Sequence, residues 1–396
     1  MENLRPEIDV LRRRLLAAGG AAGFAGWTPA ALAQGKPLPP YASFKDASRV
    51  IVHSTNTIGT KRSAFGTSAV TPQNILYVRN NLAAPDLSIA QNPDAWTIEV
   101  EGVTQPRKLT VGELKRMGLS SVAMVLQCSG NGRAFFSHKA SGTRWTVDAA
   151  GNTIWSGVPV KTVVAALGGV REDRRYMTTT GGEVIPAGVD PKTVMVERSV
   201  PWTAMEEAIL AWEVNGEPLS VAHGAPLRLI VPGYYGVNNV KYVKRLAFTA
   251  EQADANIQRS GYRMRPPGVK GAPSQPSMWE MNLKSFVTGP SGEGLVRAGD
   301  LQVHGVAFSG GSPVNAVEVS MDGGKTWQAA RFFGPNQGRY AWRQFVLPAR
   351  PSPGTYEITS RAIADDGEVQ PEMGLENERG YGHNGWRAHA VKVTMT

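Results

Sequence analysis

The chain has 396 residues, which is long enough for two domains, and its 42% hydrophobic and 19% charged residues are ordinary for a soluble globular protein. The net charge of +9 is spread out, with no lysine tract and no aromatic–basic stripe, so it favours small anions and an acidic protein partner over nucleic acid. A single cysteine excludes an intramolecular disulfide.

The first 33 residues have the features of an export signal. Arg12, Arg13 and Arg14 precede an apolar, small-residue stretch from Ala17 to Ala31, and Ala31–Ala33 offers a cleavage site. A twin-arginine pair before a weakly hydrophobic core indicates the Tat route, which carries folded, cofactor-loaded proteins. The alternative is a membrane anchor, but glycines and a proline break the short apolar stretch. We expect the mature chain to begin near Gln34.

Strand and helix signals then alternate irregularly, without a βαβ rhythm. Residues 35–75, rich in Pro, Ser, Thr and Asn, are expected to wrap the surface. Thr110 and Glu113 form a capping box that predicts a helix start. Strand signals lie at 76–79, 96–102, 122–126, 194–196, 209–214 and 229–231, and further helix signals at 161–167 and 206–210. This pattern predicts an α+β fold.

The sequence pattern changes in the C-terminal part, where short alternating strands follow a proline-rich segment. Residues 263–277 hold four prolines and are typical of a linker. Short alternating strands follow at 301–308, 317–321, 344–347 and 356–361, with a hairpin turn at Asp322-Gly323-Gly324. They predict a β-sandwich of roughly immunoglobulin size. The expected domains are therefore 1–33 (signal), 34–270 and 271–396.

Cys128 is the strongest candidate for chemistry. It ends the apolar run Val122–Leu126, and a glycine-bearing turn and Arg133 follow it, which favours an accessible thiolate. The alternative is a buried structural cysteine, which needs none of these neighbours. His138 is the nearest histidine, but nothing around it suggests a catalytic dyad. The residues alone thus indicate a thiolate that is able to bind metal, with arginines nearby.

The segment Cys128-Ser-Gly-Asn131-Gly-Arg133 resembles the molybdenum-ligating segment of the sulfite oxidase family. Further segments resemble that family in the same order, from about residue 70 to the end. They are 76–81, 215–219, 223–228, 231–241, 258–262 and 319–327. The nearest group is the bacterial periplasmic sulfite dehydrogenases, which lack the family's haem domain.

The resemblance implies a sulfite-oxidase-type molybdopterin domain followed by an immunoglobulin-like dimerisation domain, hence a homodimer. It implies the molybdenum–molybdopterin cofactor, with Cys128 as the protein ligand to the metal. The catalytic residues carried over are Arg79, Cys128, Arg133, Trp145, Tyr262 and, from the second domain, Arg387. The cofactor-binding residues carried over are Tyr77, Arg79, Asn80, Asn81, Cys128, Asp190, Ser199, His223, Arg228, Asn239, Val240 and Lys241.

One position departs from the family pattern, because Asn81 stands where the family has histidine. Asparagine can still donate a hydrogen bond but cannot carry charge, which alters the electrostatics near the pterin.

The implied reaction is the periplasmic oxidation of sulfite to sulfate. No haem-binding CxxCH motif occurs in the chain, so the electrons are expected to leave one at a time to an external cytochrome c. The alternatives are a sulfoxide reductase or a sulfane dehydrogenase of the same fold, and a non-enzymatic exported binding protein.

Overall fold

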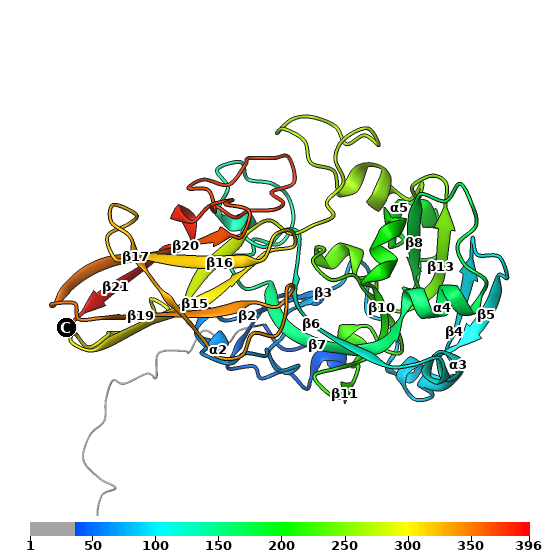
Figure 1. Cartoon of the computed structure of the whole chain (residues 1–396), viewed down its shortest axis with the longest axis horizontal. Helices are drawn as coiled ribbons and strands as arrows, with labels where there is room; N and C mark the ends of the chain where they lie inside the picture. The colour runs from blue at the N-terminus through cyan, green and yellow to red at the C-terminus, as the bar shows by residue number, and fades with distance from the viewer. Residues whose placement is uncertain (1–35) are drawn as a thin grey trace, which may run out of the picture. The chain divides into compact units, whose positions relative to one another are not determined.

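Strands dominate residues 36–396, the part of the chain that this computed structural model describes (Figure 1). The predicted export signal lies outside these residues. Pro37–Thr396 form one unit by their contacts. Five sheets with few short helices confirm the predicted α+β class.

Three sheets are built before residue 250. The first is antiparallel and contains β1 (Val50–Ser54), β2 (Thr57–Thr60) and β3 (Val78–Arg79). The second has the order β11-β10-β7-β6, with β12 beside β10; its strands are β6 (Ser120–Gln127), β7 (Ala150–Pro159), β10 (Ile209–Val214), β11 (Glu217–Pro218) and β12 (Arg228–Ile230). The third has the order β5-β4-β13-β8-β9; its strands are β4 (Thr97–Glu101), β5 (Arg107–Thr110), β8 (Tyr176–Gly181), β9 (Glu197–Pro201) and β13 (Val243–Thr249).

The helices are short. The α-helices are α2 (Arg62–Phe65), α3 (Val111–Arg116), α4 (Val160–Ala166) and α5 (Pro191–Val194). Single turns are η1 (Pro40–Ala42), η2 (Leu87–Ala90), η3 (Pro93–Ala95), η4 (Arg133–Phe135), η5 (Trp202–Glu206), η6 (Val221–His223), η7 (Gly236–Asn238), the π-helical η8 (Ile257–Gly261) and η9 (Arg387–His389). Among residues 36–396, no helix is both long enough and apolar enough to cross a membrane.

The helices predicted from local sequence signals are present at α3 and α4, but the helix predicted at 206–210 is not. The capping box of Thr110 and Glu113 is formed, with both reciprocal hydrogen bonds. The predicted helix over 206–210 is wrong, because η5 ends at Glu206 and β10 begins at Ile209. Strand β10 pairs with both β7 and β12, and this pairing outweighs the local preference for a helix.

Two four-stranded sheets form the C-terminal part. One has the order β14-β15-β19-β18 and the other β17-β16-β20-β21. Their strands are β14 (Lys284–Gly289), β15 (Leu301–Phe308), β16 (Val314–Ser320), β17 (Gln328–Ala329), β18 (Arg331–Phe333), β19 (Arg343–Ala349), β20 (Gly354–Ala364) and β21 (Val391–Met395). They confirm the predicted sandwich, and its yellow-to-red strands form a group of their own in Figure 1. The domain boundary at residue 270 stays a prediction.

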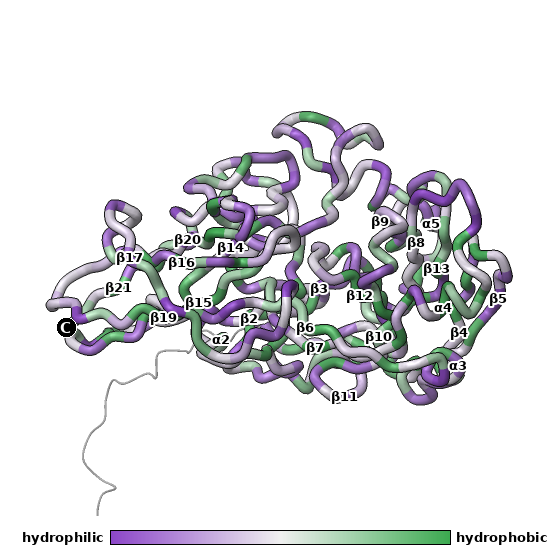
Figure 2. The backbone as a smooth tube through the Cα atoms, in the orientation of Figure 1, coloured by the Kyte–Doolittle hydropathy of each residue, from purple (hydrophilic) through white to green (hydrophobic). Residues whose placement is uncertain are grey.

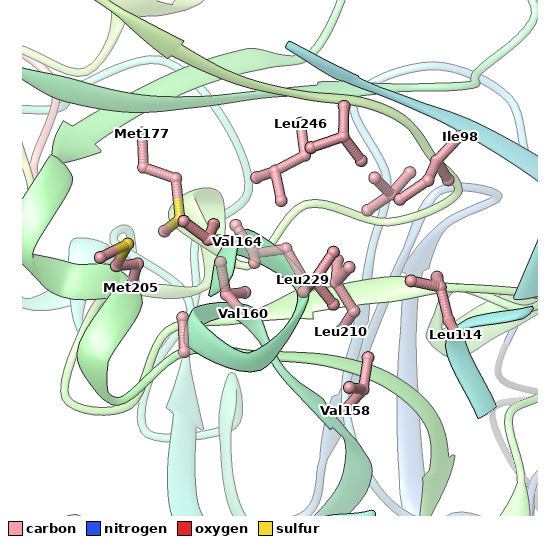
Figure 3. Packing of buried hydrophobic residues seen from close by; sticks show 14 of the residues in the cluster. Ile98, Leu114, Val158, Val160, Val164, Met177, Met205, Leu210, Leu229 and Leu246 are labelled. Carbon is pink, nitrogen blue, oxygen red and sulfur yellow. The ribbon is translucent and has the colours of Figure 1, made fainter. Parts of the chain in front are cut away.

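The largest buried cluster lies between the second and third sheets (Figure 3). Val158 and Leu210 face it from the second sheet, Ile98 and Leu246 from the third, and Val164 reaches it from α4. Figure 2 shows how apolar stretches along the strands alternate with hydrophilic loops. The cluster therefore holds the two sheets whose loops carry the candidate site.

A second cluster joins the sandwich to the rest of the unit. Val125 of β6 and Tyr262 pack there with Phe286 of β14 and with Trp342. The segment before residue 75 is also more deeply placed than expected, because all four residues of β2 are buried. Both the sandwich and the N-terminal segment therefore support the strand that leads to Cys128.

Candidate active site

Cys128 directly follows strand β6, whose last four residues are buried. Its backbone N–H donates to the carbonyl of Ala149 at 2.9 Å, so the residue before β7 anchors it. The chain then turns: the N–H of Asn131 donates to the Cys128 carbonyl at 2.9 Å, and Gly132 has a φ of +95°. Cys128 is a free, half-buried cysteine that lines two cavities. A thiol held rigidly at a cavity wall is well placed to bind a soft metal.

The first cavity has an empty volume of about 620 Å³, part of it open to solvent. Eleven of the residues singled out in the sequence line it: Tyr77, Arg79, Asn80, Asn81, Cys128, His223, Arg228, Asn239, Val240, Lys241 and Tyr262. They come from segments more than 180 residues apart in the sequence, which the first and second sheets and the loop after β12 bring together.

Positive groups outnumber negative ones around this cavity. Burial lowers the pKa of Lys241 well below the usual lysine value and that of Arg228 to about 10. Behind the wall, the buried Lys45 contacts Nε2 of His223 at 2.8 Å, and burial lowers its pKa too. Glu183 is the one acid among the described lining residues, and burial raises its pKa to about 7. Glu183 attracts Lys241, but it is a single acid facing several cations, and this excess of positive charge indicates a site built to receive an anion.

Some hydrogen-bond donors of the cavity wall already have an acceptor within the protein, and others have none among the described residues. Lys241 Nζ donates to Asn80 Oδ1 and to the carbonyl of Ala222, both at 2.6 Å. Among the described residues, Asn80 Nδ2 and Arg79 Nη1 are buried without a hydrogen-bond partner. A buried donor without a partner is costly, so both are expected to meet an acceptor supplied by a ligand.

The second cavity meets the first at Arg79, Asn81, Cys128 and Tyr262. Arg133, Trp145, Arg379 and Tyr381 add further walls, and the last two come from the C-terminal part of the chain. Three arginines therefore line a cavity that also contains the thiol. Guanidinium groups pair with two oxygens of an oxyanion at once, so this cavity suits a small oxyanion.

Arg133 of this cavity is held by backbone carbonyls rather than by an acid. Arg133 is buried; its Nε donates to the carbonyl of Arg379 and its Nη1 to that of Thr143, both at 2.9 Å. Arg379 keeps a buried Nε without a partner among the described residues. Because no carboxylate among residues 36–396 forms an ion pair with Arg133 or Arg379, their charge remains available to an incoming anion.

Trp145 is held from behind by a polar pair. The ring of His53 packs edge-on against it with centroids 4.7 Å apart, and His53 Nε2 lies 2.7 Å from Asp148 Oδ2. Asp148 is buried and also accepts from the N–H of Thr146 at 2.6 Å. The orientation of Trp145 therefore depends on residues from β1 and from the loop before β7.

Three predicted site residues lie outside both cavities. Asp190 is exposed and accepts from the N–H of Lys192 at 3.0 Å as the N-cap of α5, so it was misplaced by the loose spacing of its segment. Ser199 is buried within β9, where its hydroxyl contacts Thr178 Oγ1 at 2.7 Å. Arg387 lies half exposed in η9, with Nη2 at 2.6 Å from Glu372 Oε1.

Three charged or aromatic lining residues were not predicted from the sequence. Glu183 takes the acidic place expected of Asp190, and Arg379 the place expected of Arg387. Tyr381 completes the second cavity beside Arg379. The available signal was the run Asn377-Glu-Arg379-Gly-Tyr381, since glycine after arginine marks a turn able to aim the side chain inward. Sequence spacing alone does not separate this arginine from Arg387.

Comparisons with known proteins agree with this geometry. The family model described as oxidoreductase molybdopterin binding domain matches residues 84–257, and the one described as Mo-co oxidoreductase dimerisation domain matches residues 275–395. Together they define a molybdopterin oxidoreductase. Human mitochondrial sulfite oxidase is 32% identical over 83% of this chain, and the chain spans 62% of its length. Chicken sulfite oxidase is 30% identical over 76% of this chain, and the chain spans 68% of the length of that protein.

A solved structure is similar over nearly the whole chain. The sulfane dehydrogenase SoxCD from Paracoccus pantotrophus matches with a TM-score of 0.73 and 25% identity, covering 96% of this chain and 98% of that one. With the sequence relatives, the chain belongs to the sulfite oxidase family.

This membership makes the molybdenum–molybdopterin cofactor the cofactor of the chain, and the residues present fit it. Cys128 would supply a thiolate ligand to the metal. Arg228, His223 and Lys241 would hold the anionic end of the pterin, and the unpartnered Nδ2 of Asn80 would find an acceptor on it. When bound, the group supplies oxygen-atom transfer coupled to electron transfer.

Proposed function

We propose that this chain oxidises sulfite to sulfate and passes the electrons one at a time to an external cytochrome c. Sulfite takes one oxygen atom from water and gives up two electrons, and two protons are released. The support is the family, the two sulfite oxidases quoted above and the cavity lined by Cys128 and three arginines.

One observation carries the proposal more than the others. Two buried guanidinium nitrogens, Arg79 Nη1 and Arg379 Nε, have no partner among the described residues and belong to the cavity that contains Cys128. Sulfite is a small oxyanion, largely dianionic near neutral pH, whose oxygens would satisfy both donors. Arg133, held rigidly by two carbonyls, would complete the anion site without reorganising.

The proposal includes export to the periplasm and a homodimer. The twin-arginine segment and the Ala31–Ala33 cleavage site support export by the Tat route. The match to a dimerisation domain over residues 275–395 supports the dimer. Transfer to a cytochrome c rests on the absence of a CxxCH motif in the sequence.

Oxidation of sulfane sulfur is the second candidate, because the similar solved structure SoxCD is a sulfane dehydrogenase. Assays with thiosulfate and with sulfite on the same metal-loaded protein separate the two candidates.

The test uses the protein exported by a host that makes the molybdenum cofactor. We expect about one molybdenum per chain and sulfite-dependent reduction of ferricyanide and of cytochrome c. Thiosulfate, methionine sulfoxide and nitrate are assayed beside sulfite. A metal-loaded protein that turns over one of these and not sulfite would remove the proposal.

Cys128→Ser is expected to abolish activity and the protein-sulfur signal in molybdenum X-ray absorption, whereas loss of stability alone would indicate a structural cysteine.

A further inference from the structure

Two tyrosines from distant parts of the chain stack face to face in the second cavity. The rings of Tyr262 and Tyr381 are 4.8 Å apart at an interplanar angle of 5°. The guanidinium of Arg198 lies 5.5 Å from the centroid of Tyr262, and that of Arg133 lies 5.4 Å from the centroid of Tyr381. Each cation adds attraction to an aromatic face. The four side chains therefore form one layered stack across two parts of the fold.

The outer layers of this stack are fixed in place. Arg198 is buried, donates from Nη1 to the carbonyl of Ile257 at 2.9 Å and from Nη2 to Asn238 Oδ1 at 3.1 Å. Ile257 begins η8, the turn that delivers Tyr262. Arg133 is held by its two carbonyl contacts, as described above. These hydrogen bonds fix the positions of both guanidinium groups, against which the two tyrosine rings pack.

Tyr381 is clamped through its own backbone. Its N–H donates to Asn377 Oδ1 at 2.9 Å, and Asn377 Nδ2 donates to its carbonyl at 2.8 Å. Asn377 is itself buried. The next residue, Gly382, donates its N–H to the carbonyl of Ser129 at 2.8 Å, directly beside Cys128. The position of the Tyr381 ring is thus tied to the loop that carries the thiol.

We propose that Tyr381 is a positioning residue that holds the ring of Tyr262 against Arg198, and so fixes the Tyr262 hydroxyl at the junction of the two cavities. Tyr262 lines both cavities and touches the space beside Cys128, whereas Tyr381 acts through the flat face of its ring. The inference rests on the proposed function only for the identity of the anion.

A double-mutant cycle on the metal-loaded enzyme tests this role, with sulfate binding measured by calorimetry and sulfite turnover measured separately. Tyr381→Leu removes the flat face and is expected to weaken sulfate binding about tenfold, the upper range for an aromatic pair. Tyr262→Phe removes the hydroxyl and is expected to weaken it by a similar factor. Because Tyr381 acts through Tyr262, the double variant should bind no more than about twofold more weakly than Tyr262→Phe.

Tyr381→Phe is the matched control, since it keeps the ring and removes the hydroxyl. It should bind sulfate within about twofold of the unmodified enzyme, because stacking depends on the ring face. If Tyr381→Phe binds as weakly as Tyr381→Leu, the hydroxyl binds the anion directly and the positioning role is overturned. Additive effects in the cycle would overturn it as well.

Two outcomes keep the test decisive. If Tyr381→Leu does not retain molybdenum, Tyr381→Met takes its place in the cycle, because it fills the volume without a flat face. A chain that shows the coupling in sulfate binding but does not oxidise sulfite retains the positioning role and loses the proposed substrate. A chain that oxidises sulfite without the coupling retains the substrate and loses the role.

Discussion

At the residue scale, the side chains around Cys128 are arranged by charge. Arginines and lysines near the thiol outnumber the acids, of which Glu183 is the one among the described lining residues, and Arg79 and Arg379 keep buried donors without a partner among the described residues. Such an arrangement destabilises the protein without a ligand and favours an anionic one. The position of each arginine relative to the cavity is therefore the feature that mutation tests most directly.

Arg379 and Arg387 form a matched pair for this test, because both belong to the same C-terminal segment and only the first lines the cavity. We expect Arg379→Met to raise the KM for sulfite by about 10- to 100-fold, the range for a hydrogen bond to a charged group. Arg387→Met should leave KM within about twofold, since a half-exposed ion pair contributes little. Equal effects of the two substitutions on KM would contradict this placement.

Lys45 is the residue whose substitution should affect cofactor retention most specifically. Its ammonium has three donors, and it meets the carbonyls of Gln73 and Leu76 as well as His223 Nε2. Nε2 of His223 lies 2.8 Å from Lys45 Nζ and 3.4 Å from the carbonyl oxygen of Gln73, so Lys45 supports the orientation of the His223 ring.

We expect Lys45→Met to lower the molybdenum content of purified protein by about tenfold or more, as loss of a supporting hydrogen bond does in metal sites. Lys45→Arg should recover part of it. Full molybdenum content in Lys45→Met would show that His223 needs no such support. Metal analysis with a pterin assay reads the outcome without reference to activity.

At the element scale, the turn after β6 is the most constrained segment. Gly132 has a φ of +95°, and a Cβ there would lie 2.7 Å from the Cβ of His383. Any side chain would therefore push the Cys128 loop against the C-terminal part of the chain. The Cys128 loop and the segment that carries His383 approach each other so closely at residue 132 that only glycine fits there.

Gly132→Ala should consequently lower the free energy of unfolding by more than the strain of about 1–3 kcal/mol expected for a non-glycine residue at positive φ. Gly338→Ala is the matched control, because its φ of +107° is also positive and no atom lies within 4 Å of the added Cβ. Urea denaturation of both variants separates strain from the clash. Equal losses would show that the loop adjusts freely.

At the scale of the whole described unit, the sandwich and the Cys128 loop meet at a buried cluster of basic side chains. Lys284 donates to the carbonyl of His383 at 2.8 Å, and His383 Nδ1 lies 3.2 Å from His389 Nε2. Arg62 donates to the carbonyl of His389 at 3.2 Å. Burial lowers the pKa of Lys284 to about 7, and burial together with Lys284 lowers the pKa of His383 to about 3.

This cluster predicts a loss of stability in acid. Between pH 6.5 and about 3 the unfolded chain protonates His383 and the folded chain does not, so the free energy of unfolding falls as the pH falls through that window. His383→Gln should flatten this dependence, and its difference from the unmodified protein should change by more than about 1 kcal/mol between pH 7 and pH 4. Parallel stability curves for the two proteins would contradict the prediction.

Much of the fold and of the first cavity follows from local patterns. The capping box at Thr110, the strands of the sandwich and the strand before Cys128 are short-range features, and the structure has them where they were predicted. The helix over 206–210 fails because strand pairing from both sides outweighs a local preference. The eleven predicted residues that line the first cavity were named by the resemblance of short motif segments to the sulfite oxidase family, because local patterns indicated only the thiol and nearby arginines.

By itself, the sequence determined the fold class and the thiol, because these depend on neighbours along the chain, and the resemblance of its motifs to the sulfite oxidase family indicated most of the cationic wall. Only the tertiary structure decided which C-terminal side chains reach the thiol. Asn377 and the contact from Gly382 to Ser129 turn that segment so that Arg379 and Tyr381 point inward and Arg387 does not. The hydrogen bond from Gly382 to Ser129 joins residues about 250 positions apart, and no spacing within the C-terminal segment encodes that contact.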